Sequence, residues 1–267
     1  MRFLILTMIC AFFCVTPLSA KMIHLESQLS VTTKKNTIDI SIKISNTGSA
    51  TAYDIVTRIH FLEALKESRP IHQLSPNLSE TITMVFDLQK SIKGHYPLIV
   101  EIQFHDMNLY PFYSLRCTPI SIKHQKQVNT LTVHVPQLKM SAQNTIDVHV
   151  KNQNSVNRNI CIQMIVSRAF LCEKNTHFLV LPKNQSAEID FCILKKNALP
   201  ATTHNGYIII TYKENAVSYA QVTPFNIYIK PVDRLFLLKK DFIAKTCLFF
   251  GLLWMLFVTY VSYRKKT

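Results

Sequence analysis

Residues 37–44 read TIDISIKI, with an apolar side chain at every second position. A period of two is that of a β-strand with one buried face and one solvated face. Residues 146–151, which read IDVHVK, show the same alternation. Both stretches are therefore predicted to be strands that cover a hydrophobic core on one side.

The two stretches belong to an internal repeat. Residues 36–40 (NTIDI) return as 144–148 (NTIDV) at an offset of 108. LSPNLS at 74–79 returns as LPKNQS at 181–186, and TPI at 118–120 returns as TPF at 223–225, at offsets of 107 and 105. A period near 107, with the matches in the same order, is typical of a duplicated domain. We expect one module over residues 21–123 and a second over 124–232.

Each module is predicted to consist of strands. No helical stripe of useful length lies between the periodic segments, and turn residues separate them. About seven short strands per hundred residues indicates a mainly β chain with two tandem immunoglobulin-like antiparallel β-sandwiches. The strands expected are 22–33, 37–44, 52–62, 80–88, 96–105 and 112–123, then 129–138, 146–151, 158–168, 176–181, 187–194, 206–213 and 217–230.

Both ends carry membrane-targeting signals. Residues 1–20 combine one cation, an apolar run of about 13 residues and a small-residue end at Ala20, which predicts a cleavable signal peptide, its helix removed after Ala20. An uncleaved N-terminal anchor is the alternative. Residues 246–263 contain no charge, and at about 1.5 Å per residue they cover about 27 Å, which predicts one C-terminal transmembrane helix. A buried core helix is the alternative here.

The charges around residues 246–263 predict the orientation. Residues 233–245 form a juxtamembrane segment that ends at Lys245, and residues 264–267 form a basic tail with Arg264, Lys265 and Lys266. Cations concentrate on the cytoplasmic side of membrane spans. We therefore expect a type I single-pass protein with its body outside the cytoplasm and the lipid bilayer as one partner.

The net charge of +14 does not by itself indicate a nucleic-acid binder. Residues 233–267 hold seven basic and two acidic residues, so about a third of the excess lies beside the expected membrane span. The remaining cations are dispersed, without the clustered basic stripe that phosphate binding requires. The chain has only four glycines, which disfavours Gly-rich linkers and phosphate loops. We expect no nucleic-acid partner.

A resemblance to known modules lies at residues 44–56, ISNTGSATAYDIV. Asn46 and Gly48 suit a turn between core strands, and Ala50 and Ala52 permit close packing. The stretch resembles extracytoplasmic immunoglobulin-like modules of the CARDB, NEW3 and DUF11 kind, and more weakly the lumenal domain of the translocon-associated protein beta subunit. The resemblance implies a fold rather than an activity. Residues 154–160 of the second module lack the glycine.

Chemistry-bearing residues are sparse. Three cysteines of the second module, Cys161, Cys172 and Cys192, are candidates for a disulfide, with free thiols as the alternative. There is no Cys-x-x-Cys or His-x-His spacing for zinc, and the one adjacent His–carboxylate pair, His105-Asp106, is predicted to be a solvated turn. No nucleophile elbow or phosphate loop is present. We expect no cofactor, no metal and no enzymatic activity.

Asn77 and Asn184 each begin an Asn-x-Ser sequon at equivalent repeat positions, so both are candidate glycosylation sites in a eukaryotic host. In a bacterium the same residues are turn residues. We favour a bacterial inner membrane with the body facing the periplasm, with the endoplasmic reticulum membrane as the alternative.

Two functions remain for such a chain. The first is a membrane-anchored extracytoplasmic arm, whose two immunoglobulin-like domains bind an unknown protein partner by strand addition or loop contact. The second is an accessory subunit of a membrane complex for translocation, glycan assembly or envelope maturation.

Overall fold

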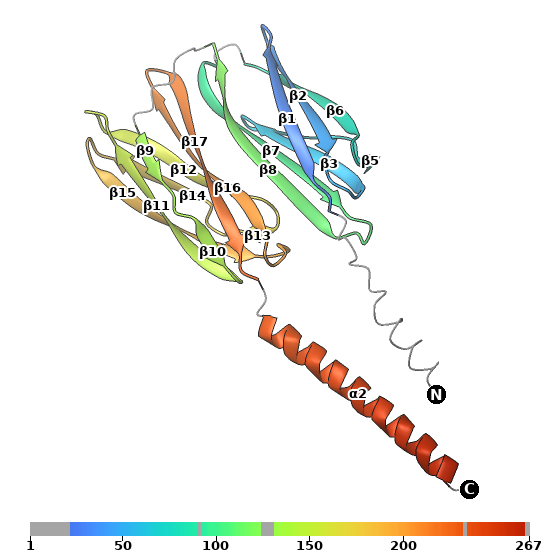
Figure 1. The fold of residues 1–267 in the computed structure, drawn as a ribbon. Helices are drawn as coiled ribbons and strands as arrows, with labels where there is room; N and C mark the ends of the chain where they lie inside the picture. The colour runs from blue at the N-terminus through green and yellow to red at the C-terminus, as the bar shows by residue number, and fades with distance from the viewer. Residues whose placement is uncertain (1–21, 90–91, 124–130, 232–233, 265–267) are drawn as a thin grey trace.

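The computed structural model describes residues 22–89, 92–123, 131–231 and 234–264. These residues form β-strands and one C-terminal helix, so the predicted mainly β class is confirmed (Figure 1). The expected signal peptide at residues 1–20 lies outside the described residues, as do Lys265 and Lys266.

The first module is built from two sheets that face each other across a core. One has the order β1-β2-β6, and the other joins β7 to β3 and β8, with β4 and β5 on the outer edge of β3. Its strands are β1 (Leu25–Thr33), β2 (Thr37–Asn46), β3 (Ala52–Phe61), β4 (Ala64–Glu67), β5 (Ile71–Leu74), β6 (Ser79–Asp87), β7 (Gly94–His105) and β8 (Pro111–Ile122).

The second module has the same two-layer construction. One sheet has the order β13-β15-β11-β9, and the other has the order β14-β12-β16-β17, with β10 parallel to β17. Its strands are β9 (Leu131–His134), β10 (Leu138–Met140), β11 (Gln143–Asn152), β12 (Arg158–Val166), β13 (Phe170–Leu171), β14 (Thr176–Leu181), β15 (Ser186–Lys195), β16 (Thr203–Glu214) and β17 (Val217–Ile229).

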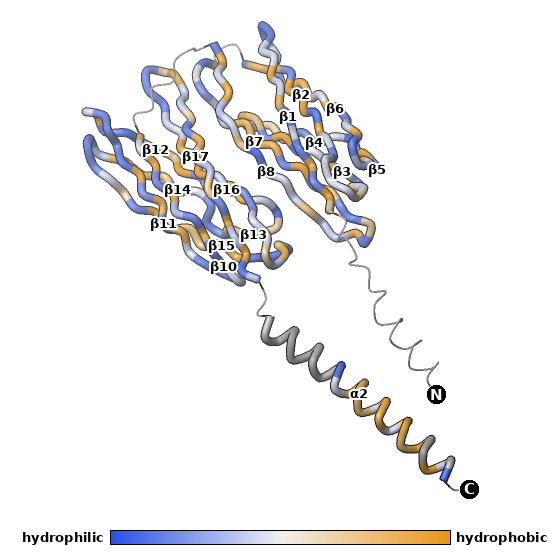
Figure 2. Tube along the Cα trace, viewed as in Figure 1, coloured by the Kyte–Doolittle hydropathy of each residue, from blue (hydrophilic) through white to orange (hydrophobic). Residues whose placement is uncertain are grey.

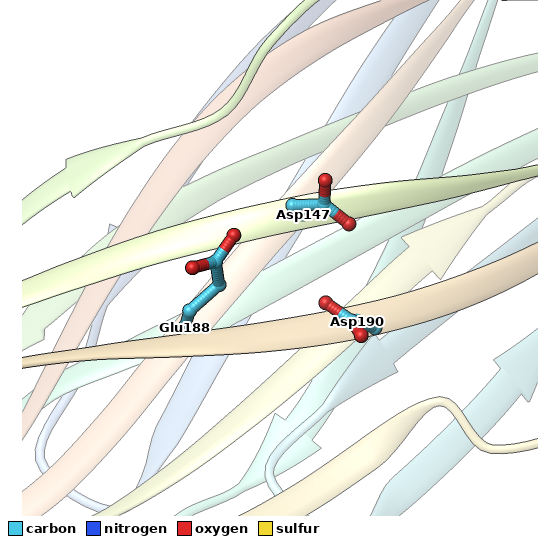
Figure 3. Close-up of side chains that lie close together, drawn as sticks. All are labelled: Asp147, Glu188 and Asp190. Carbon is cyan, nitrogen blue, oxygen red and sulfur yellow. The ribbon is translucent and has the colours of Figure 1, made fainter.

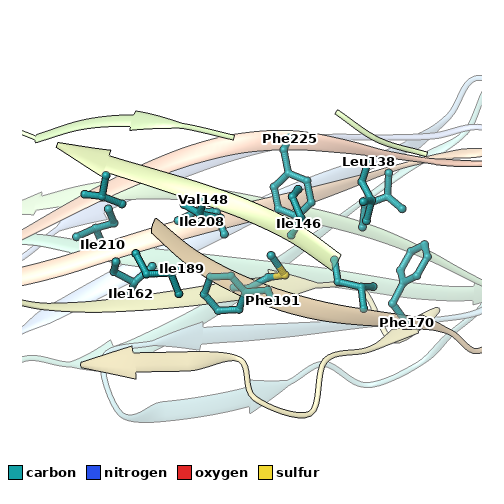
Figure 4. Packing of buried hydrophobic residues seen from close by; sticks show 14 of the residues in the cluster. Leu138, Ile146, Val148, Ile162, Phe170, Ile189, Phe191, Ile208, Ile210 and Phe225 are labelled. Atoms are coloured by element: carbon teal, nitrogen blue, oxygen red, sulfur yellow. The ribbon is translucent and has the colours of Figure 1, made fainter. Parts of the chain in front are cut away.

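Each module has its own hydrophobic core, and the alternating stretches fill it as predicted. Ile38, Ile40, Ile42 and Ile44 on β2 are all essentially inaccessible to solvent. In the second module, Ile146 and Val148 of β11 occupy the equivalent place among side chains from the facing sheet (Figure 4). Burial of these aliphatic residues supplies most of the favourable free energy of folding, at about 25 cal/mol per Å² of apolar surface.

Two details of the strand prediction were wrong. The single strand expected over 129–138 is two strands, since β9 pairs with β11 in one sheet and β10 pairs with β17 in the other. Pro136 lies at the crossover, where a residue without an N–H group interrupts ladder pairing. The strands β4, β5 and β13 were not predicted, because two to four residues are too few to show a period.

The predicted turn after β2 is held by a buried asparagine. The Asn46 Nδ2 group donates to the carbonyl oxygens of Ala50 and Leu74, at 2.8 Å each, and its Oδ1 accepts from the Gly48 N–H at 3.1 Å. Asn46 is fully buried, so the amide replaces water as the partner of these backbone groups. A Cβ on Gly48 would lie 2.3 Å from the carbonyl oxygen of Met22, so glycine is required by the close approach of the chain.

The second module reproduces this turn with Asn152. Its Nδ2 donates to the carbonyl oxygens of Val156, Leu181 and Pro182 at 2.8, 3.2 and 3.1 Å, and its Oδ1 accepts from the Asn154 N–H at 3.0 Å. The buried amide, rather than the glycine, is therefore the shared feature of the two turns. Asn154 carries a side chain at the position equivalent to Gly48. The close approach of the Met22 backbone to Gly48 is therefore a feature of the first turn and not of the second.

The two sandwiches lie side by side rather than end to end (Figure 1). A third hydrophobic cluster forms between them, in which Leu115 and Cys117 of β8 meet Tyr207 and Ile209 of β16. The Tyr207 hydroxyl donates to the Leu115 carbonyl oxygen at 3.3 Å. At the edge of the cluster the carboxylate of Glu101, which is itself buried, accepts from the backbone N–H of Arg168 at 3.1 Å and from its Nε at 3.0 Å. The modules are thus joined by an apolar and hydrogen-bonded interface.

Close backbone contact completes this interface. β7 and β17 run parallel where Gly94 meets Ser218, and the Ser218 N–H donates to the Lys93 carbonyl oxygen at 3.1 Å. A Cβ on Gly94, whose φ is +127°, would lie 2.0 Å from the Ser218 carbonyl oxygen. Only glycine permits this approach.

The C-terminal helix α2 (Arg234–Arg264) follows β17 and extends away from the sandwiches (Figure 1). Most of its described length is strongly apolar (Figure 2), and the side chains of Leu248, Trp254 and Phe257 are exposed. No helix among the described residues combines the length and the apolar character that a bilayer crossing demands.

Candidate protein-interaction surface

Strand β14 is an exposed edge of the ten-stranded sheet. It pairs with β12 on one side, and no other described strand pairs with it. Two large apolar side chains stand on its outer face: Phe178 is 80% exposed and Val180 is 62% exposed. An edge strand with unpaired backbone groups and apolar side chains is a template for strand addition.

A groove of about 790 Å³ begins at β14 and runs to the first module. Phe178 and Val180 form one wall, and Tyr96 and Pro97 of the first module form the other. The lining is mostly apolar, and its remaining residues are His95, Asn159, Ile160, Cys161, Leu179, Thr211, Tyr212, Lys213, Ser218 and Tyr219. The side-by-side packing of the sandwiches therefore creates the groove.

The groove continues the apolar interface between the modules. On β12, Cys161 and Ile165 point to the same side of the sheet, since they are four residues apart in one strand. Ile165 packs in the intermodule cluster, whereas Cys161 lines the groove. The outer face of the sheet that contains β12 is thus covered by β8 near Ile165 and open to the groove near Cys161.

Stacked rings support the groove wall from behind, on the face of the β12–β16–β17 sheet that packs in the core of the second module. The rings of Tyr212 and Tyr219 are parallel with centroids 5.0 Å apart, and the Arg158 guanidinium lies 4.3 Å from the Tyr212 centroid. Arg158 Nη2 in turn donates to a Glu214 carboxylate oxygen at 2.9 Å. A preorganised wall loses little conformational entropy when a ligand binds.

The role of β14 as a binding edge was not predicted from the sequence. The signal that could have done so is the run Phe178-Leu179-Val180-Leu181, which is apolar on both faces rather than alternating. Leu179 and Leu181 serve the core of the second module, which leaves Phe178 and Val180 for another partner.

The three candidate disulfide cysteines are free thiols in the structure. Cys161 lines the groove on the outer face of its sheet, pointing away from the core, whereas β13 and β15, which position Cys172 and Cys192, belong to the opposite layer. Cys172, just after β13, lies close enough to Cys192 for the two thiols to interact electrostatically, and burial raises the Cys172 pKa, as Cys192 does to a smaller extent. Of the three pairings, only Cys172–Cys192 is compatible with this arrangement. The pairing itself stays a prediction.

Both sequon asparagines occupy exposed turns with a left-handed backbone. φ is +64° at Asn77 and +56° at Asn184. Asparagine tolerates this conformation better than most residues, so turn geometry accounts for both positions. Their glycosylation stays a prediction. Of the residues expected to flank the membrane span, Lys245 and Arg264 are exposed on α2.

Three carboxylates converge on the outer face of the second module, although no metal site was predicted. Asp147 on β11 lies directly opposite Asp190 on β15, and Glu188 is their neighbour (Figure 3). One oxygen of each lies within 4.8 Å of the others, a spacing that a hard divalent cation could bridge. All three are exposed, and His149 Nε2 lies 3.6 Å from Glu188 Oε1. Such a cluster is more often solvated than metal-bound.

Comparisons with known proteins do not place the chain in a family. No protein-family model matches it, and no curated protein matches it. The resemblance to the CARDB, NEW3 and DUF11 modules therefore stays a prediction.

Distant structural likenesses exist. A transglutaminase from red sea bream is 12% identical, with 76% of this chain and 31% of that chain covered and a TM-score of 0.27. Salmonella alpha-2-macroglobulin reacted with methylamine is 9% identical, with 77% and 16% covered and a TM-score of 0.31. Escherichia coli alpha-2-macroglobulin activated by porcine elastase is 9% identical, with 80% and 22% covered and a TM-score of 0.30. The chain spans less than a third of each, and similarity this low implies no shared function.

Proposed function

We propose that the chain is a non-enzymatic, membrane-anchored protein of the extracytoplasmic space that binds an extended segment of a partner protein along β14. The observation that carries the proposal is the exposed edge of β14, with Phe178 and Val180 beside an apolar groove. An exposed apolar edge strand of this kind is expected to be covered by a partner chain, because otherwise its unpaired backbone groups would pair with other strands non-specifically.

The recognition follows from strand geometry. The partner's backbone would pair with β14, and its alternate side chains would pack on Phe178, Val180 and the groove floor at Cys161. Backbone pairing supplies affinity with little sequence preference, and the groove selects apolar side chains. The single cation of the groove, Lys213, would favour an acidic residue at the partner's end.

The proposal includes no catalysis. The only thiol of the groove is that of Cys161, and its burial raises the Cys161 pKa. A thiol kept protonated at neutral pH is a poor nucleophile.

The anchor in this proposal is α2. Residues 246–263 contain no charged side chain, and the described apolar side chains of α2 are exposed. A helix that is apolar all round requires a lipid or protein cover. We favour the bacterial inner membrane, with the sandwiches in the periplasm.

Trp254 tests the anchor directly, because it is the only tryptophan of the chain. We expect its fluorescence to be quenched when the full chain is reconstituted into vesicles containing acyl-chain-brominated lipid. Unquenched emission would remove the membrane from the proposal.

Site-specific photocrosslinking tests the β14 interaction. A photoreactive residue at Phe178 is expected to give one discrete adduct in intact cells, and the double variant Phe178→Asp/Val180→Asp is expected to lose the partner in mild-detergent purification. The matched control is a photoreactive residue at Val85, an exposed apolar position on the edge strand β6.

Equal adducts at both positions, or unchanged co-purification of the double variant, would contradict the β14 assignment. Stoichiometric membrane proteins that survive the double variant would instead favour the accessory-subunit alternative.

A further inference from the structure

The turn between β7 and β8 presents two apolar side chains to solvent from a hydrogen-bonded backbone. Met107 is 80% exposed and Leu109 is 70% exposed. Asp106 Oδ1 accepts from the N–H groups of Asn108 and Tyr110, at 2.9 Å each, and the Leu109 N–H donates to the Asp106 carbonyl oxygen at 3.0 Å. His105 thus ends β7 and Asp106 begins the turn; both are half-buried, and the two apolar residues lie at the apex of the turn.

This turn is bonded to a loop of the second module. The Tyr110 hydroxyl donates to the Asn197 carbonyl oxygen at 2.5 Å, and burial raises the Tyr110 pKa, as the neighbouring Tyr113 also does. Leu199, two residues further along that loop, is exposed as well. Residues 106–110 and 196–202 therefore form one rim, which we call the anchor-side rim.

Strand directions place this rim at the end of the body from which α2 leaves. β7 and β17 run parallel, so the turn after β7 and the end of β17 lie at the same end (Figure 1). Lys196 and Lys230 are exposed at that end too. Surfaces that insert into the headgroup region of a bilayer typically combine apolar side chains with flanking cations.

We propose that the anchor-side rim inserts Met107, Leu109 and Leu199 into the interfacial layer of the membrane in which α2 is anchored. This inference rests on the membrane anchor of the proposed function. Its consequence is that the body stands on the bilayer in a fixed orientation rather than swinging on a flexible stalk.

Tryptophan placed in the rim tests the inference in the full chain. In a Trp254→Phe background, Met107→Trp is expected to show blue-shifted emission and quenching in phosphatidylcholine–phosphatidylglycerol vesicles brominated near the headgroup. Leu199→Trp provides an independent second position. The control is Leu65→Trp in the same background, since Leu65 is an exposed position on β4 in the first module. We expect no quenching there.

The outcomes separate the two proposals. Quenching of Trp254 in the natural chain, with Met107→Trp and Leu199→Trp no more quenched than Leu65→Trp, would overturn the rim contact and leave the anchor. Quenched rim positions with an unquenched Trp254 would support the rim contact and overturn the anchor. If neither is quenched, both fail.

Discussion

The side-chain amides of Asn46 and Asn152 make equivalent hydrogen bonds in the two sandwiches. Each donates from Nδ2 to the carbonyl oxygen of the residue four positions later, Ala50 or Val156, and to a carbonyl on the strand before the next turn. Both amides are fully buried. The turn that connects the two sheets is therefore fixed by a single side chain in each module.

We expect Asn46→Ala and Asn152→Ala each to lower the free energy of unfolding by about 2–4 kcal/mol, because buried carbonyl groups lose their donors. Urea denaturation of the purified chain measures this. The matched control is Asn144→Ala, whose amide donates to the Lys139 carbonyl in an exposed setting, with an expected effect below about 0.5 kcal/mol. If Asn144→Ala lowered the free energy of unfolding as much as Asn46→Ala and Asn152→Ala do, the buried amides would not be what stabilises the two turns.

Gly94→Ala is expected to open the interface between the modules. The new methyl group would overlap the Ser218 backbone, so β7 and β17 would have to separate. We expect the single unfolding transition of the joined modules to divide into two, as seen by calorimetry. Gly251→Ala is the control, since nothing lies within 4 Å of a Cβ at that position. An unchanged transition in Gly94→Ala would show that the contact at Ser218 is not required.

Cys117 offers a chemical probe of the same interface. Burial raises its pKa to about 12, so the thiol is protonated at neutral pH and shielded by the second module. We expect maleimide at pH 7.5 to label the half-buried Cys192 in the folded chain and to leave Cys117 unmodified, as peptide mass spectrometry would detect. In Gly94→Ala, labelling of Cys117 should rise at least tenfold. Rapid labelling of Cys117 in the natural chain would be inconsistent with a closed interface.

The carboxylate cluster of the second module predicts a substitution that stabilises the chain rather than destabilising it. Asp147 and Asp190 are directly opposed across two strands, and like charges in that position destabilise a sheet. We expect Asp190→Asn to raise the free energy of unfolding by about 0.2–1 kcal/mol at low ionic strength, with a smaller gain in high salt. Millimolar calcium should stabilise the natural chain more than the variant if the cluster binds the ion. Destabilisation by Asp190→Asn would require a different account of the cluster.

His204 predicts a pH dependence of stability. Burial lowers the pKa of this histidine, which lies beside Phe170 and exchanges a hydrogen bond with Thr202. In the unfolded chain the His204 side chain has the ordinary histidine pKa of about 6.5. Near and below that pH the unfolded state therefore binds more protons than the folded state, and stability falls as the pH drops from 7 towards 5.

The urea midpoint of His204→Gln should depend less on pH across this range than that of the natural chain. His72→Gln, at a strongly exposed side chain, should leave the dependence unchanged. Equal dependence in all three proteins would assign the effect to other groups.

The strands were predictable wherever one face meets a core and the other meets water, as at β2 and β11. The alternation fails where both faces of a strand are apolar. β14 is apolar on both sides, and β16 carries Ile208, Ile209 and Ile210 in succession because it separates the module core from the intermodule cluster. Burial between the modules depends on contacts between residues about 90 positions apart, such as Leu115 and Tyr207. The periodicity of a short stretch of sequence contains no information about such contacts.

The side-by-side packing sets the two repeats in opposite directions. β8 and β17 match in the sequence repeat, yet β17 runs parallel to β7 and hence opposite to β8. This is the geometry of a two-fold homodimer contained within one polypeptide. A dimer dissociates on dilution, whereas this contact is intramolecular and holds at any protein concentration. Covalent linkage also releases the halves from symmetry, so the two end strands of the ten-stranded sheet can differ: β14 presents Phe178 and Val180, whereas β4 carries the charged Lys66 and Glu67.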